Sequence, residues 1–300
     1  MHANENQTLT MEVFKQKVQT EKAQITDCDL SEKIKTVTKE SHVRANNTEL
    51  MQAFQRGNIT LIQYKLLLCS LFKIYEALEE ELDRNASHDS VAPIYFPQEL
   101  ARMEALKKDL EHFYGQDWRE KMTVPASTLR YAQRLREIGS EHPEYLVAHA
   151  YTRYLGDLSG GQVLSRVPQR CLGLKNGEGL AFFTFPAVSS PNLFKQLYRS
   201  RMNSIELTET QREGVLQEAV RAFEFNIQVF DELQDLVNIS EKNELRQRNR
   251  EHNLTTPDVR VSQSSAPSSS LTSPSQLLRM LLGVCLALAV GMGMYAFEIE

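Results

Sequence analysis

The chain has 300 residues, of which 41% are hydrophobic and 24% charged, a composition typical of a protein with a sizeable core. The formal net charge of −5 excludes a globally basic surface for nucleic acid, so no nucleic-acid partner is expected. The 4 cysteines form no CxxC pair, which excludes a disulfide scaffold and a zinc ribbon.

The first 30 residues are mostly polar and are expected to form a flexible N-terminal segment. They lack the apolar stretch of roughly 7–15 residues that a secretory signal needs. Export by that route is therefore not expected.

Residues 31–237 have the size and the patterning of one helical domain. They contain no run of strict apolar and polar alternation, and their apolar side chains recur three and four residues apart, as between Leu61 and Leu82. Ser204 or Thr208 is expected to cap the last long helix of this region. Glycine and proline interrupt the pattern often enough to predict an all-α domain of seven to nine helices.

Two lysines and a histidine, which could bind an anion and a metal ion, share one face of the first predicted helix. Lys35, Lys39 and His42 are four and three residues apart, so they line up over about 10 Å. This pattern suits an anion beside a metal, and it equally suits a solvated cationic face with a satisfied histidine. Lys195 and Arg199 repeat the cationic spacing further along the chain.

The segment 148–162 places three glycines in a strongly helical context. Gly156, Gly160 and Gly161 each cost about 1 kcal/mol relative to alanine inside a helix, so their missing side chains serve a purpose. One interpretation is close helix packing, or a helix end at Gly160 and Gly161. The other is main chain pressed against a flat ligand, with a kink at Gly160 and Gly161 and with Arg153 and Asp157 beside it.

The C-terminal region changes character twice. Residues 238–276 are charged and then serine-rich, with few large apolar side chains, and are expected to form a disordered linker. From Met280 to Phe297 there are no charges over about 27 Å of helix, close to the thickness of a thin bilayer. We expect residues 277–297 to form a transmembrane tail anchor, the alternative being a buried core helix.

Several long stretches of this sequence carry a family resemblance. These are LVAHAYTRYLGDLSGGQVL after Tyr145, GEGLAFFTFP from Gly177 and FKQLYRSRMNS from Phe194. On these motifs the chain resembles the heme oxygenases of animals, most closely the inducible, tail-anchored type, because no Cys-Pro dipeptide is present. The resemblance covers residues 31–237 and the anchor, and it implies heme b held between a proximal helix and a kinked distal helix.

The resemblance assigns the iron and the distal side of the heme to particular residues. His42 corresponds to the proximal iron ligand, and Gly156 and Gly160 correspond to glycines whose main chain covers the opposite face of the heme. Asp157 corresponds to the carboxylate that organises distal water, and our hypothesis is that through this water it supplies a proton for attack on a meso carbon. Its implied network partners are Tyr75, Tyr131 and Arg153.

The remaining implied heme contacts are cationic or aromatic. The propionate-binding cations and the heme-edge and pocket residues are Lys35, Lys39, Lys195, Arg199, Tyr151, Phe223, Asn226 and Phe230. One position departs from the family pattern, because Asn46 stands where a glutamate four residues after the ligand is common. A neutral acceptor there is expected to leave the imidazole less electron-rich and to shift the iron potential.

The implied activity is the opening of heme to biliverdin, carbon monoxide and ferrous iron. The sequence holds no nucleotide-binding loop, so NADPH electrons are expected from NADPH-cytochrome reductase of the microsomal membrane. The expected location is the endoplasmic reticulum membrane with the catalytic domain in the cytosol. Biliverdin reductase, membrane lipid and self-association through the anchor are further candidate partners. Rival interpretations are a heme sensor or store and a helical adaptor without heme.

Overall fold

The computed structural model describes residues 29–254, without the side chains of some residues near 162 and beyond 239. The expected N-terminal segment up to residue 28, the linker beyond 254 and the anchor at 277–297 lie outside this range. Within it every regular element is helical and there is no strand. None of the helices described is both long and apolar enough to span a bilayer.

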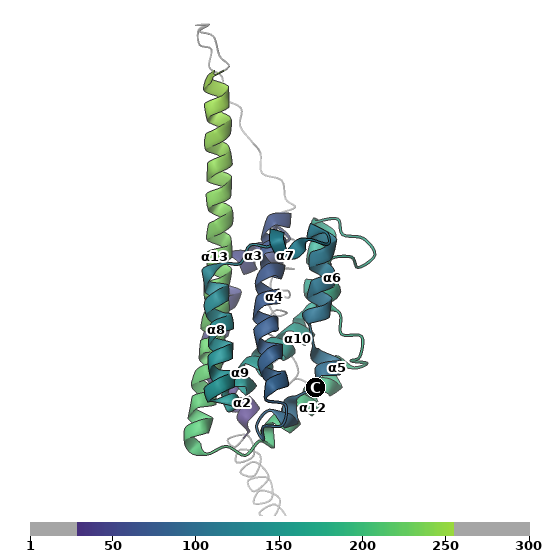
Figure 1. The fold of residues 1–300 in the computed structure, drawn as a ribbon, viewed down its shortest axis with the longest axis vertical. Helices are drawn as coiled ribbons and strands as arrows, with labels where there is room; N and C mark the ends of the chain where they lie inside the picture. The colour runs from purple at the N-terminus through teal and green to yellow at the C-terminus, as the bar shows by residue number, and fades with distance from the viewer. Residues whose placement is uncertain (1–28, 255–300) are drawn as a thin grey trace, which may run out of the picture.

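Helices of very different lengths follow one another along the chain (Figure 1). The α-helices are α2 (Leu30–Asn46), α3 (Glu49–Arg56), α4 (Leu61–Arg84), α5 (Pro97–Leu100), α6 (Met103–Tyr114), α7 (Trp118–Lys121), α8 (Ala126–Glu141), α9 (Leu146–Ala150), α10 (Gly156–Leu164), α11 (Arg166–Cys171), α12 (Pro191–Asn203) and α13 (Glu209–Leu254). Four short segments join them: η1 (Ala92–Ile94), η2 (Pro143–Tyr145), the π-helix η3 (Tyr151–Leu155) and η4 (Ala181–Phe183).

The all-α prediction is confirmed. The expected number of seven to nine helices matches only the longer α-helices of the described residues, because the short ones were not predicted. Four of the α-helices described, α5, α7, α9 and α11, have 4, 4, 5 and 6 residues. A helix that short completes less than two turns, so it shows no apolar period in the sequence. Three of them, α7, α9 and α11, pack against the longer helices α6, α4 and α10, respectively.

Helix α4 lies at the centre of the domain, with α8 on one side and α6 on the other (Figure 1). It begins at a capping box in which the Thr60 hydroxyl accepts from Gln63 N–H and the Gln63 side chain accepts from Thr60 N–H. Leu68, Ile74 and Leu78 of α4 are fully buried. Burial on several sides explains why this helix is apolar over much of its circumference.

Helix α13 packs along α2 and α8, and it extends past the other helices (Figure 1). Its start is the predicted one, because Thr208 and Gln211 exchange the two hydrogen bonds of a capping box. The last buried side chain described on it is Val237, but the helix continues to Leu254.

The expectation of a structureless linker from residue 238 is therefore wrong for residues 238–254. Few apolar side chains are available there, yet Glu, Lys, Arg, Gln and Leu dominate, and no glycine or proline intervenes. Strong helix formers continue a helix that has already been nucleated, because each added residue gains a hydrogen bond without a new nucleation cost.

Gly139 sets the distance between α8 and α4. A Cβ at this position would lie 2.7 Å from Glu81 Cγ and 2.8 Å from Glu81 Cβ, and Glu81 is fully buried. We expect Gly139→Ala to destabilise the fold by about 1–3 kcal/mol, because overpacking outweighs the roughly 0.5–1 kcal/mol gained in helix propensity. Thermal melting against Ser140→Ala, an exposed neighbour, measures the difference; an unchanged melting temperature would contradict the close packing.

Candidate functional site

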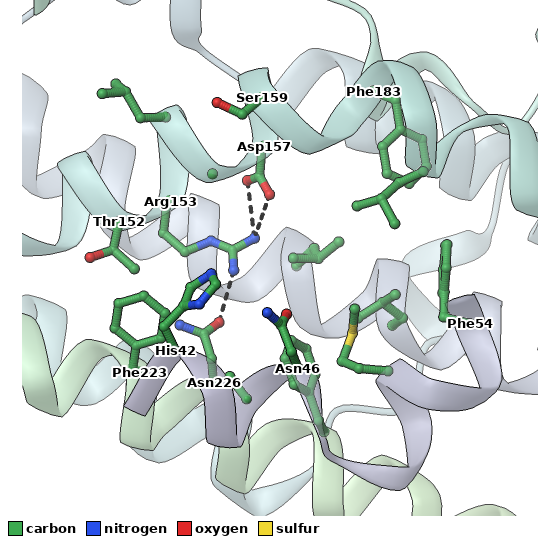
Figure 2. A pocket seen from close by; sticks show the side chains of 18 of the residues that line it. His42, Asn46, Phe54, Thr152, Arg153, Asp157, Ser159, Phe183, Phe223 and Asn226 are labelled. Atoms are coloured by element: carbon green, nitrogen blue, oxygen red, sulfur yellow. Dashed lines mark hydrogen bonds and ion pairs between the residues drawn. The ribbon is translucent and has the colours of Figure 1, made fainter. Parts of the chain in front are cut away.

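One pocket brings together residues from both halves of the domain (Figure 2). Its empty volume is about 960 Å³ up to and including its open mouth. The walls come from α2, α3, α4, the η3 and α10 segment, η4 and α13, and they are mainly apolar. The lining residues are His42, Ala45, Asn46, Met51, Phe54, Leu67, Leu71, Thr152, Arg153, Leu155, Gly156, Asp157, Ser159, Leu164, Phe182, Phe183, Phe223, Asn226 and Phe230.

His42 supplies the imidazole of this pocket from α2. The residue is 8% exposed, and its ring meets the edge of Phe223 on α13 at a centroid distance of 5.7 Å. Asn46 lies one turn further along α2 and lines the same wall (Figure 2). Lys35, Lys39 and His42 lie on one continuous helix, as their spacing predicts, and the C-terminal end of this helix faces the pocket.

The opposite wall is an irregular helix formed by α9, η3 and α10 in succession. Gly156 lines the pocket, and a Cβ there would meet nothing within 4 Å. Gly161 instead packs against η4, because a Cβ there would lie 2.9 Å from the carbonyl oxygen of Phe183. Close packing, the first interpretation of the glycines, therefore holds at Gly161, whereas Gly156 has open space toward the pocket, which is compatible with main chain lying against a flat ligand. Gly160 is buried in α10 and does not line the pocket.

The expected kink at Gly160 and Gly161 is wrong in its position. Both residues lie within α10, and the irregularity is the π-helix from Tyr151 to Leu155, immediately before Gly156. A π-turn carries an extra residue per turn and leaves the regular i→i−4 ladder. Glycine content does not reveal this turn, because residues 151–155 contain no glycine.

Asp157 is the acidic group of the pocket, and its partners hold it in place. Arg153 donates to it at 3.0 Å, and the Tyr75 hydroxyl from α4 also donates to the carboxylate. Burial raises the pKa of Asp157, although Arg153 and Tyr75 partly oppose that effect. Burial also raises the pKa of Tyr75, and the charge of Asp157 raises it further, so the phenol stays protonated. Arg153 in turn donates to Asn226 on α13 at 2.8 Å (Figure 2).

Tyr131 lies behind this network and does not line the pocket. It is fully buried on α8, stacks on Phe225, and its hydroxyl lies 3.1 Å from Nδ1 of His149. The other ring nitrogen of His149 lies 3.1 Å from Glu218, which also accepts from Arg134. The expected link between Tyr131 and Asp157 is thus indirect and passes through the Asn226 side chain.

Glu218 is expected to make the domain sensitive to acid. Burial alone would raise its pKa, but hydrogen bonds from His149 and Arg134 lower it to about 2. A folded-state pKa below the usual value stabilises the fold above about pH 4.5, and this contribution, up to roughly 3 kcal/mol, is lost as the pH falls toward 2.

The measurement is urea unfolding of the original chain and of Glu218→Gln at several pH values. We expect a stability difference at pH 7 that narrows steadily below pH 5. Glu213→Gln changes an exposed carboxylate on the same helix and serves as the matched control. A difference that is independent of pH would contradict the assignment.

The predicted cations lie on α2 and α12, which contact each other. None of Lys35, Lys39, Lys195 and Arg199 lines the pocket as defined above, and Lys39 is exposed. Partial burial and the neighbouring Arg199 lower the pKa of Lys195. Cations that repel each other in this way are stabilised by an anion. Tyr151 is buried in η3, outside the pocket lining.

Sequence reasoning missed much of the apolar lining of the pocket. Met51 and Phe54 on α3 and Leu67 and Leu71 on α4 each follow the helical period, so they resemble ordinary core residues. Phe182 and Phe183 lie inside the quoted GEGLAFFTFP stretch but had no role assigned to them. An apolar residue of the core and one of a pocket wall have the same sequence pattern, so only the fold separates them.

The fold and the pocket define an all-helical protein with an imidazole and a partly buried carboxylate on facing walls of an apolar cavity. Residues 28–232 match the family model described as heme oxygenase. A heme oxygenase of Takifugu rubripes is 62% identical over 269 residues, covering 89% of this chain and 94% of that protein. Heme oxygenase 1 of Homo sapiens is 47% identical over 277 residues, covering 89% of this chain and 96% of that protein. The chain belongs to the heme oxygenase family.

Solved structures show the same fold. Heme oxygenase-1 of the cyanobacterium Synechocystis, determined in complex with heme, is 36% identical, with a TM-score of 0.67, and the match covers 72% of this chain and 99% of that one. The heme oxygenase of Leptospira interrogans is 37% identical, with a TM-score of 0.66, over 68% of this chain and 99% of that one.

Proposed function

We propose that this chain, as a heme oxygenase, binds heme in the pocket between α2 and the η3 and α10 segment and opens it to biliverdin, carbon monoxide and ferrous iron. The observation that supports this proposal most strongly is that His42 lies on one wall of the pocket and Gly156 and Asp157 lie on the opposite wall. The site combines a ligating nitrogen, open space above a backbone and a held carboxylate.

The residues present fit heme. Heme is a flat apolar plate with a central iron and two carboxylates at one edge, so it needs an axial ligand, apolar walls and cations. His42 would ligate the iron, and Phe223 and Phe230 would pack against the ring. Lys195 and Arg199 on α12, with Lys35 and Lys39 on α2, would bind the propionates. The open space at Gly156 leaves room for a ring next to the main chain.

When bound, heme supplies both the redox-active iron and the ring carbon that is oxidised. The chain contributes the groups that supply a proton and hold it in position on the distal side of the pocket. Asp157 holds a proton-bearing water in the distal space, while Arg153 and the Tyr75 hydroxyl fix the carboxylate. Because Gly156 has no side chain, the distal space beside Asp157 stays open to water and oxygen.

The test is a hemin titration followed by reaction with ascorbate and oxygen. We expect a saturable Soret shift and then loss of the Soret band with formation of a verdin absorption. A stable ferrous-oxy spectrum would indicate instead a heme sensor or store. No Soret shift at all would favour a helical adaptor without heme.

We propose further that residues 277–297 anchor the chain in the endoplasmic reticulum membrane, with the helical domain on the cytosolic side. The uncharged run from Met280 to Phe297 supports this proposal. Electrons then come from NADPH through NADPH-cytochrome reductase in the same membrane, and biliverdin reductase accepts the product. Membrane fractionation of the full chain and of a chain ending at residue 276 tests it. Equal partition of both chains into the soluble fraction would overturn the anchor.

A further inference from the structure

The pocket wall at η4 is held by two buried charged residues, one directly before α6 and one in the middle of α6. Asp109 is fully buried, and its carboxylate oxygens accept from the N–H groups of Ala181 and Phe182 at 2.8 Å each. Arg102, 4% exposed, donates from Nη1 to the carbonyl oxygens of Phe182 at 3.2 Å and of Thr184 at 2.5 Å. A carboxylate therefore binds one end of this short turn and a guanidinium binds the other.

The guanidinium is itself fixed in position. Its Nε donates to the carbonyl oxygens of Leu100 at 3.0 Å and Ala101 at 2.8 Å, and its Cζ lies 3.7 Å from the ring centroid of Phe185. Burying a charge is costly unless hydrogen bonds replace its hydration. Arg102 and Asp109 meet this need with main-chain groups of η4 and its neighbours, so displacing η4 would leave both charges poorly solvated.

The turn that they hold touches both halves of the distal network. The Phe182 ring lies 5.8 Å from the ring of Tyr75, whose hydroxyl donates to Asp157. The Phe183 carbonyl oxygen lies against Gly161 of α10, the helix that carries Asp157. A shift of η4 would therefore move Tyr75 and α10 together.

We propose that Arg102 and Asp109 are positioning residues for heme oxidation, acting through η4 on Tyr75 and on α10 above the substrate. Neither residue lines the pocket, so neither is a catalytic residue. Which ring carbon is attacked depends on where α10 and the pocket walls stand relative to the ring. The inference rests on the proposed function, because it concerns the placement of that site.

The first experiment measures hydrogen exchange in the heme-free chain after Asp109→Asn. Asparagine keeps the shape, but its NH₂ group faces one of the two backbone N–H donors, so one hydrogen bond is lost. We expect exchange at residues 181–184 to become about tenfold faster or more, with α8 unchanged. Glu104→Gln alters an exposed carboxylate on α6 and should leave exchange as it is. Unchanged exchange at 181–184, or equally faster exchange everywhere, would overturn the proposal.

The second experiment uses hemin-loaded protein and Arg102→Lys, which keeps the charge but cannot reach the same carbonyl groups from two nitrogens. It also replaces the first variant if Asp109→Asn does not fold. We expect a changed proportion of verdin isomers and a lower kcat with little change in hemin affinity. An isomer distribution and a kcat equal to those of the original chain would overturn the positioning role. If the original chain forms no verdin, the proposed function fails, and the exchange experiment alone then decides whether these residues fix η4.

Discussion

Asp157→Ala is expected to bind hemin normally and to lose verdin formation by about 10²- to 10⁴-fold, the range that positioned acid–base groups contribute. The carboxylate lines the pocket, and Arg153 and Tyr75 hold it there. Its removal takes away the carboxylate to which we assign the ordering of distal water, while leaving His42 and the apolar walls in place. Single-turnover reaction with ascorbate and oxygen, followed by absorbance, measures the effect.

Two further variants make this result specific to the carboxylate. Asp157→Asn preserves the shape and accepts a hydrogen bond, but it cannot carry the proton, so it should be nearly as slow as alanine. Asp89→Ala removes an exposed acid elsewhere and should react at the original rate. Normal verdin yield from Asp157→Ala would contradict the proposed proton role, and loss of hemin binding would show that the residue supports the pocket instead.

The sequence predicts best those site residues that lie on long, regular helices. His42 on α2, and Phe223, Asn226 and Phe230 on α13, were assigned by family resemblance, and the helical spacing agrees with their lying on one wall. Both helices are long and regular, so position along the chain determines the direction of each side chain.

The parts that the sequence did not predict depend on contacts between distant segments. Asp109 and Ala181 are 72 residues apart and are joined by a hydrogen bond to main chain, which no side-chain pattern encodes. The π-helix at Tyr151–Leu155 likewise contains no glycine or proline that would mark it in the sequence. Helix α13 shows the opposite case, since Val237 is the last buried side chain among those described, whereas the helix continues to Leu254 on residues of high helix propensity.

On the wall opposite Asp157, the substitution of His42 is expected to have an equally large effect. His42→Ala is expected to weaken hemin binding by at least about tenfold and to remove the spectral signature of an axial imidazole, because outer-shell partners alone are worth 10- to 100-fold in metal sites. The imidazole is 8% exposed and is held at the edge of Phe223, so it is already oriented. Hemin titration by absorbance and the electron paramagnetic resonance of the ferric complex measure both effects.

Added imidazole separates loss of the ligand from loss of the fold. Truncation to alanine leaves a space on α2 that free imidazole can enter, so millimolar imidazole should restore the original ferric spectrum in His42→Ala. His142→Ala, which removes a half-exposed imidazole from the loop after α8, should bind hemin as the original chain does. If His42→Ala retains an unchanged ferric spectrum, another side chain ligates the iron and the pairing of α2 with Gly156 across the ring is wrong. A rescue that restores the spectrum but not verdin formation would show that the covalent link from the ligand to α2 also positions the ring under Asp157.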